Sequence, residues 1–242
     1  MSNYPLKHLP SGHIFIDSGD DCDRVVNAIL ETDYCEEFCL AADFNEDFIR
    51  RLMESGFLVM SMELKENGDE AALPYEPFYI LLPKLHLLRS ALFFPALHVK
   101  KSIRSVLPLY ELGVDTCFDL VLKKCIQIHG DDWLTPPLVE ALKGIREMKN
   151  SRVKPVSFEV YRDGELKAGE IGVVAGHVYT SYSGYREENN AGTAQMILMA
   201  RWLEKTGFHF IDMGMPLDYK TDLGAKDISP RHFVDLFRAG RQ

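Results

Sequence analysis

Hydrophobic and polar residues alternate with a period of two from Val156 to Tyr185, which is typical of β-strands. Two pairs of turn residues, Asp163-Gly164 and Ala175-Gly176, interrupt this run, so we expect a three-stranded β-meander. The period then changes to that of a helix from Asn190 to Lys205. The apolar segment FHFIDMGM at 208–215 follows and is predicted to be a buried strand.

The rest of the chain divides into further helices and strands by the same criteria. Helical spacing predicts helices at 24–31, 46–56, 117–130, 136–150 and 230–240. The residues expected to begin three of them are Asn45, Thr135 and Ser229. Apolar runs predict strands at 38–44, 57–64, 77–86 and 90–98.

A polar segment at 65–74, KENGDEAALP, is the best candidate for a domain boundary because it combines charge, Gly and Pro. We therefore expect a small N-terminal α/β domain at 1–75 and a second domain at 76–242. In the second domain, a β-meander is followed by a helix that begins at a small-residue turn, and then by a buried strand. That order is the order of the GNAT-like N-acyltransferase core, so the predicted fold class is α+β, GNAT-like.

Composition restricts the classes of function that remain. The 242 residues are 46% hydrophobic and 26% charged, as in folded globular proteins. We expect neither a bilayer-spanning segment nor a secretory signal, since no apolar run has the required length or position. The formal net charge of −9 argues against general binding to nucleic acid, because Lys and Arg supply that affinity. The best candidates for a local phosphate-binding patch are Lys100, Lys101 and Arg104.

The chain has five cysteines, an odd number that indicates a reducing compartment, and we expect a cytoplasmic protein. Cys35 and Cys39 are four residues apart and could share a helix face, but no second Cys/His pair lies at zinc-finger spacing. We expect buried thiols, no metal site and no cofactor. The eight histidines are scattered, and most are expected to be structural or on the surface.

Two features of the last third can carry chemistry. The NNAGTAQ turn at 189–195 opens the long helix, and free N–H groups there suit an anion or a developing oxyanion; a well-capped structural helix explains the same residues. Its glycine spacing is wrong for a coenzyme A loop, and Glu187 and Glu188 would repel a pyrophosphate. Asp212 ends a buried strand and is either a hydrogen-bond anchor or a polariser of a catalytic group.

Several segments, in order, resemble the leucyl/phenylalanyl-tRNA–protein transferase family. SALFFPALHVKKSIRS is similar to the family's strand and basic helix, and Asp132-Trp133-Leu134-Thr135 to its Thr-Trp-Ile segment. SFEVYRDGELKAGEIGVVAGHVYTSYS resembles its Ser-Val-Glu-Val-Trp meander. Asn190-Ala191 and FIDMGM resemble Asn-Ala-Ser-Lys and Leu-Ile-Asp-Cys-Gln. The likeness covers roughly residues 40–238.

This resemblance implies a function and a set of site residues. The family transfers Leu, Phe or Met from aminoacyl-tRNA to the N-terminal amine of a protein, which marks that protein for degradation through an N-degron. On this chain, the resemblance assigns Asp212 as the catalytic carboxylate. It assigns substrate binding at the tRNA 3′ end to Trp133, Tyr179, Tyr182, Ser183, Asn190, Met199, Leu203 and Gly214. Lys100, Lys101 and Arg104 would hold the acceptor stem.

The chain departs from the family at positions that matter for catalysis. Gly214 stands where the family has the Gln that helps to activate the attacking amine. Tyr182 stands where it has the Glu of Gly-Glu-Ser-Met-Phe, and LLPKLHLLR at 81–89 replaces Trp-Trp-Ser-Pro-x-Pro-Arg. Two alternatives to an active transferase therefore stay open. One is a catalytically silent member that binds tRNA, a protein N-terminus or a partner, and the other is a coenzyme A-dependent N-acetyltransferase.

Overall fold

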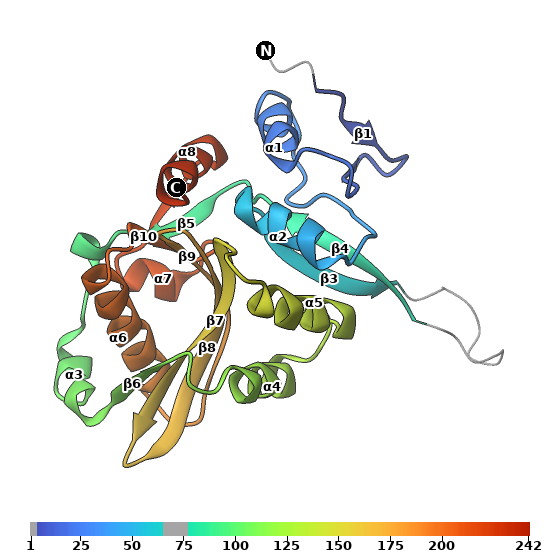
Figure 1. Ribbon diagram of the computed structural model, residues 1–242. Helices are drawn as coiled ribbons and strands as arrows, with labels where there is room; N and C mark the ends of the chain where they lie inside the picture. The colour runs from blue at the N-terminus through green and yellow to red at the C-terminus, as the bar shows by residue number, and fades with distance from the viewer. Residues whose placement is uncertain (1–3, 65–76) are drawn as a thin grey trace.

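The computed structural model describes residues 4–64 and 77–242, and a seven-stranded sheet forms its centre (Figure 1). The strand order is β11-β5-β10-β9-β8-β7-β6, and only β10 and β9 run parallel to each other. The bounds are β5 (Arg89–Leu92), β6 (Glu111–Val114), β7 (Val153–Arg162), β8 (Glu165–Ala175), β9 (Val178–Arg186), β10 (Phe210–Asp212) and β11 (Lys226–Ile228). The architecture is mixed α+β.

The predicted β-meander is confirmed as strands β7, β8 and β9. Arg162 pairs with Glu165, so the first loop contains only Asp163 and Gly164. Both have positive φ, 53° and 78°, as a two-residue hairpin turn requires. The meander therefore forms from local sequence, and it carries β9 to the edge of the site described below.

Helices cover both faces of this sheet (Figure 1). One face carries α6 (Ala191–Lys205), which starts within one residue of the predicted position. The other face carries α4 (Phe118–His129) and α5 (Pro136–Glu147), also at predicted positions. Two clusters of buried hydrophobic residues correspond to these faces, and α6 belongs to one while α4 and α5 belong to the other.

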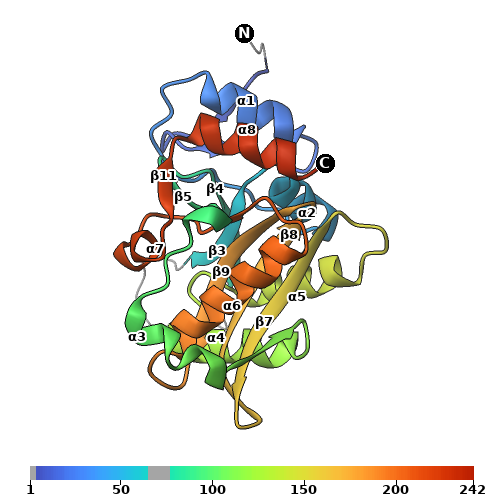
Figure 2. The ribbon, with the colours of Figure 1, turned by 90° about the vertical axis from the view of Figure 1, so that its left-hand side faces the viewer.

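A smaller layer packs beside the sheet. It contains β1 (Lys7–His8), β2 (Ile14–Phe15), α1 (Cys22–Leu30), α2 (Glu46–Glu54), β3 (Leu58–Leu64), β4 (Phe78–Lys84) and the C-terminal helix α8 (Pro230–Gly240). Figure 2 shows α1 and α8 side by side, although they come from opposite ends of the chain. Arg238 Nη1 donates to Asn27 Oδ1 at 2.7 Å, and Arg241 pairs with Asp23 at 2.5 Å. The two ends of the chain thus stabilise one another.

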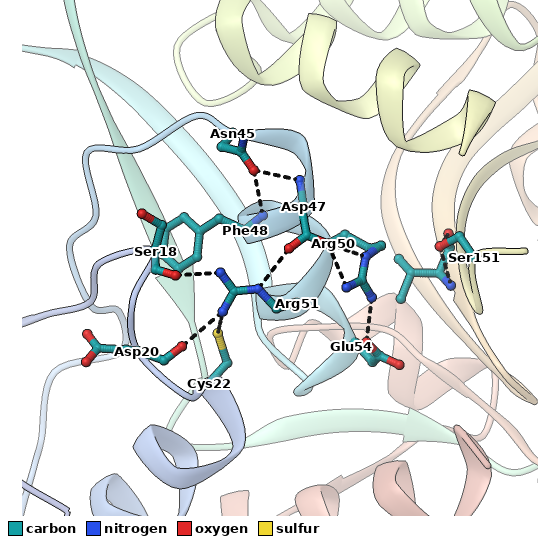
Figure 3. A network of polar contacts seen from close by, with 11 residues as sticks. Ser18, Asp20, Cys22, Asn45, Asp47, Phe48, Arg50, Arg51, Glu54 and Ser151 are labelled. Carbon is teal, nitrogen blue, oxygen red and sulfur yellow. Dashed lines mark hydrogen bonds and ion pairs between the residues drawn. The ribbon is translucent and has the colours of Figure 1, made fainter. Parts of the chain in front are cut away.

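Helix α2 is fixed by polar contacts at its start and along its side (Figure 3). Asn45 Oδ1 accepts from the Asp47 N–H at 3.0 Å, which confirms Asn45 as the residue that caps the helix. Arg51 donates to the carbonyl oxygens of Ser18 and Asp20, at 2.6 and 3.0 Å. These bonds hold α2 against the preceding loop and position β3, which follows it in the chain.

Two predictions about the first hundred residues are wrong. Residues 38–44 make isolated bridges at Phe38, Leu40 and Ala41 rather than a strand. The predicted strand at 90–98 ends at Leu92, and Phe94–Ala96 forms a 3₁₀ turn, since Pro95 cannot donate to a ladder. The short helix α3 (Lys101–Arg104) then carries Lys101 and Arg104, and Lys100 directly precedes it.

The expected domain boundary near residue 75 lies outside the described residues. The strands on either side of it, β3 and β4, pair with each other from Leu58↔Lys84 to Leu64↔Phe78. The division into 1–75 and 76–242 stays a prediction. Among the described residues, no helix has the length and apolarity needed to cross a bilayer.

Candidate functional site

A cavity of about 900 Å³ lies where strands β9 and β10 separate. The two parallel strands pair only as far as Thr180 and Asp212. Beyond these residues β9 continues to Arg186, while the chain after β10 turns into α7 (Asp218–Asp222). Parallel strands that separate leave a crevice at their carboxyl ends, which is a common position for ligand sites. We call this space the β9/β10 cavity.

Five parts of the chain line the β9/β10 cavity. They are β9 and its neighbour β8, the start of α6, the segment after β10 with α7, the β3–β4 hairpin with the turn after it, and the end of α4 with the loop after it. Their lining residues include Glu170, Ser181–Arg186, Gly192, Thr193, Gln195, Met213–Met215, Leu217, Tyr219, Lys220, Leu58, Met60, Lys84, His86, His129 and Trp133. Segments far apart in the sequence therefore converge on one space.

A β-bulge shapes the β9 wall. Ile171 pairs with Ser183 and Gly172 with Ser181, so Tyr182 is an extra residue in β9. Its ring centroid lies 6.5 Å from that of Trp133, and its hydroxyl accepts from the Val59 N–H at 3.1 Å. Burial raises the pKa of Tyr182, so the phenol is neutral at pH 7. The two rings form an aromatic wall of the cavity.

The N-terminus of α6 points its first turn at the cavity. Gly192 and Thr193 line the cavity, and no side chain in the described part of the chain caps this turn. Asn190 has a φ of 72° and is exposed outside the lining, where it forms the bend into the helix. A fifteen-residue helix concentrates positive partial charge at such an end. The free N–H groups can therefore receive an anion. The alternative interpretation, a well-capped structural helix, would require a capping side chain, and Asn190 makes no such hydrogen bond.

Asp212 does not line the cavity and is held by a residue that the sequence did not indicate. Arg89 Nε donates to Asp212 Oδ1 at 2.7 Å, and Nη2 donates to Oδ2 at 2.6 Å. The Gly214 N–H donates to Oδ1 at 3.0 Å. Although burial alone would raise the pKa of Asp212, Arg89 holds it below its usual value. Of the two predicted roles, these contacts are those of a hydrogen-bond anchor.

Two further buried ionisable groups line the cavity and were also missed. Glu170 is 4% exposed, and its Oε1 accepts from the Tyr179 hydroxyl at 3.0 Å. Burial raises the pKa of Glu170. Burial lowers the pKa of Lys220, whose ammonium donates to the carbonyl oxygens of Met213 and Met215. The available signal for Glu170 was one charge inside the otherwise apolar run GEIGVVA.

The structure brings only part of the predicted substrate pocket into the cavity. Trp133, Tyr182, Ser183 and Gly214 line it. Tyr179, Met199 and Leu203 do not, because they are fully buried in the cluster between α6 and the sheet.

Two of those buried residues contact side chains that line the cavity. Tyr179 donates to Glu170, and Gln195 Nε2 lies 3.4 Å from Met199 Sδ. They therefore support lining residues rather than form the lining.

The predicted basic patch is exposed and adjoins α7. Lys100, Lys101 and Arg104 are all exposed. Lys100 Nζ pairs with Asp222 Oδ2 at 2.6 Å, at the end of α7. Because α7 also supplies Lys220 to the cavity, this contact connects the patch to the cavity wall.

The cysteines are partly as predicted. Cys22, Cys39 and Cys125 are buried, but Cys35 is exposed and Cys117 is half-buried. Cys35 and Cys39 lie outside any helix and so share no helix face. Across residues 4–64 and 77–242, no group of three His, Cys, Asp or Glu side chains could hold a metal ion.

Comparison with known proteins identifies the family. The sequence model for leucyl/phenylalanyl-tRNA protein transferases matches residues 91–238. The chain belongs to this family. The matched part contains the sheet strands from β5's second half onward, α6 and most of the cavity wall, whereas Arg89 and His86 precede it.

Curated relatives carry the same name at moderate identity. A leucyl/phenylalanyl-tRNA–protein transferase of Sulfurimonas denitrificans is 29% identical over 141 residues, which are 57% of this chain and 60% of the relative. The enzyme of that name from Azotobacter vinelandii is 30% identical over 152 residues, 61% of this chain and 66% of the relative. The chain thus spans less than two thirds of the length of these relatives.

Similar solved structures include FemX and the L-PGS of Bacillus licheniformis. FemX is 11% identical with a TM-score of 0.44, covering 93% of this chain and 81% of FemX. L-PGS is 10% identical with a TM-score of 0.44, covering 98% of this chain and 89% of L-PGS.

Proposed function

We propose that this protein is a cytoplasmic aminoacyltransferase that moves a Leu- or Phe-like amino acid from aminoacyl-tRNA to the N-terminal α-amine of a protein, as part of an N-degron pathway. The observation that carries the proposal is the β9/β10 cavity, in which the free first turn of α6 faces a buried carboxylate and an aromatic wall. The GNAT-like class and the small N-terminal domain belong to the same proposal. The meander, helix and parallel strand in that order support the GNAT-like class.

Each part of the cavity has a task in this reaction. The nitrogen of the acceptor amine attacks the ester carbonyl carbon, the new C–N bond forms, and the C–O bond to the tRNA ribose breaks while the amine proton passes to the ribose oxygen. The α6 N–H groups at Gly192 and Thr193 stabilise the charge that develops on the carbonyl oxygen. Tyr182 and Trp133 contact the apolar side chain of the amino acid.

Glu170 supplies the carboxylate that the family carries at the position of Tyr182. Strand β8 places Glu170 opposite Gly184 of β9, so its carboxylate enters the same cavity from the neighbouring strand. We propose that it binds the α-ammonium of the esterified amino acid. Asp212 acts through Arg89 and the Gly214 N–H and is therefore a positioning residue in this scheme.

The second candidate function is a silent member that binds aminoacyl-tRNA or a protein N-terminus without transfer. Gly214 and Tyr182 favour it, since both replace polar family residues. Coenzyme A-dependent acetyl transfer is disfavoured by two acidic residues just before α6. Glu187 pairs with Lys124, and Glu188 accepts from the Tyr110 hydroxyl at 2.7 Å.

One assay separates these functions. The purified protein is incubated with labelled Leu-, Phe- or Met-tRNA, or with labelled acetyl-coenzyme A, and with peptides that begin with Arg, Lys or Ala. Labelled peptide from aminoacyl-tRNA is the expected result. Binding of aminoacyl-tRNA without labelled peptide would identify the silent binder. Label from acetyl-coenzyme A alone would identify an acetyltransferase.

A further inference from the structure

His86 is a buried imidazole in the wall of the β9/β10 cavity. His86 is one of the residues that line the cavity, and it is 4% exposed. Neither Nδ1 nor Nε2 has a hydrogen-bond partner among the described residues. Buried polar groups are nearly always paired, and an unpaired one requires a specific explanation.

The backbone of His86 is also unusual. Its φ is 57°, in the left-handed region that few residues other than glycine adopt. The left-handed conformation costs free energy, and strain of this kind concentrates at functional sites. Two unfavourable features thus coincide at one residue of the cavity wall.

His86 lies beside the position where the family has its glutamine. A Cβ added to Gly214 would lie 3.9 Å from His86 Nε2 and 3.3 Å from Leu58 Cδ1. The imidazole of His86 therefore occupies space toward which a side chain at position 214 would project. The turn at 213–215 that carries Gly214 is held by Lys220, which donates to the Met213 and Met215 carbonyls.

The surroundings of His86 select the neutral form of the ring. Burial lowers the pKa of His86 to about 3. The positive charges of Arg89, Lys84 and Lys220 act in the same direction, and the negative charge of Asp212 opposes them. At pH 7 one ring nitrogen can therefore accept a hydrogen bond while the other donates. The same cationic neighbours disfavour an ammonium ion and favour a neutral amine, which is the nucleophilic form.

We infer that His86 accepts a hydrogen bond from the attacking N-terminal α-amine and orients its lone pair toward the ester carbonyl. This inference rests on the proposed transfer reaction. His86 takes over the orienting task at the place that Gly214 leaves empty, and it takes no proton itself, because the amine proton passes to the ribose oxygen that leaves. The ligand of His86 is thus an unprotonated primary amine at the end of a peptide.

A binding experiment tests the inference without requiring activity. The histidine ring nitrogens are labelled with ¹⁵N, and peptides that begin with Arg are added, with a free or an acetylated α-amine. The His86 resonances are expected to shift with the free amine only, and more strongly as rising pH deprotonates it. No shift, or an equal shift with the acetylated peptide, would overturn the inference.

A kinetic experiment tests the role in transfer. His86→Asn suits the positive φ and keeps a short polar side chain, so the fold should survive. We expect kcat to fall at least tenfold with KM for aminoacyl-tRNA unchanged. His177→Asn, in the β8–β9 turn away from the cavity lining, is the matched control and should transfer normally.

The two proposals fail in different ways. If the wild-type protein transfers nothing but His86 still shifts with the free-amine peptide, the proposed transfer fails and amine recognition by His86 stands. If the wild type transfers and His86→Asn matches it, the assignment of His86 is wrong and the transferase function stands.

Discussion

Arg89 and Asp212 form a two-point ion pair in the interior, with Nε–Oδ1 and Nη2–Oδ2 distances of 2.7 and 2.6 Å. Their side chains are 1% and 0% exposed. Arg89 begins β5 and Asp212 ends β10, its neighbour in the sheet, so the pair fixes the point where β10 leaves the sheet. The Arg89 guanidinium also lies 4.2 Å from the Phe233 ring centroid, which joins α8 to the same point.

Removing one member of this pair should destabilise the protein strongly. Arg89→Met leaves a buried carboxylate without its counter-ion, and we expect the free energy of unfolding to fall by about 3–5 kcal/mol. Asp212→Leu should lower it by a similar amount. The double variant should lose less than the sum of the two, because it leaves no unpaired charge. Urea unfolding measures all three, and a single variant with the wild-type midpoint would contradict the prediction.

The pair should also make stability depend on pH in acid. The folded-state pKa of Asp212 is lowered, so its contribution is present above the unfolded value of about 3.9 and is lost as pH falls through the folded pKa. The wild type should therefore lose unfolding free energy steeply below about pH 4. Arg89→Met/Asp212→Leu should show a shallower decline over the same range. Parallel curves would show that other carboxylates dominate.

Glu170 should make the stability of the protein depend on pH in the opposite direction. Its folded-state pKa is raised, so the folded state holds more protons, and stability falls as pH rises from the unfolded value of about 4.3 through the folded pKa. Glu170→Gln should match or exceed wild-type stability at pH 7. It should weaken binding of aminoacyl-tRNA at least tenfold while leaving uncharged tRNA binding unchanged.

The control for Glu170 lies on the same strand. Glu165 is exposed and pairs with Lys167, so Glu165→Gln makes the same chemical change outside the cavity. It should leave both properties at wild-type values. If Glu170→Gln binds aminoacyl-tRNA with the affinity of the wild type, ammonium binding by Glu170 is refuted.

The sequence predicted what depends on neighbours in the chain. Asp163-Gly164 encodes a turn, so the meander was predictable, and the start of α6 followed from the change of period at Asn190. The Arg89–Asp212 pair joins residues 123 positions apart, and no local pattern reports such a contact. His86 had the same limitation, since its burial depends on packing between distant segments.

The predicted substrate pocket also shows that local sequence does not report packing between distant segments. Met199 and Leu203 are apolar residues of the right type, but apolar residues on a helix serve the core as readily as a ligand. Only the packing of α6 on the sheet decides between the two. Trp133 and Tyr182 lie in the cavity because a loop and a β-bulge place them there.

The exposed basic patch should account for much of the salt dependence of tRNA binding. Replacing Lys100, Lys101 and Arg104 with Ala should weaken binding and reduce the slope of log affinity against log salt by up to about 2 to 3, roughly 0.7 to 0.9 for each phosphate that these side chains neutralise. The matched control replaces two exposed lysines and one exposed arginine elsewhere, Lys123, Lys149 and Arg152, with Ala. Equal slopes for the two triple variants would show that net charge alone matters.

Restoring the family glutamine should succeed only if His86 makes room. Gly214 has a φ of 70°, so Gly214→Ala should lower the free energy of unfolding by about 1 kcal/mol or more. Gly214→Gln adds a side chain toward Leu58 and His86, and it should reduce transfer to an Arg-starting peptide rather than raise it. The double variant His86→Gly/Gly214→Gln relieves the positive φ at residue 86 and frees that space. We expect it to transfer more than either single variant, because effects within one contact are not additive.

Thermal unfolding of each variant separates a loss of folding from a loss of chemistry. A double variant that folds, binds aminoacyl-tRNA and yet transfers less than Gly214→Gln alone would show that the two side chains do not share one place in the site.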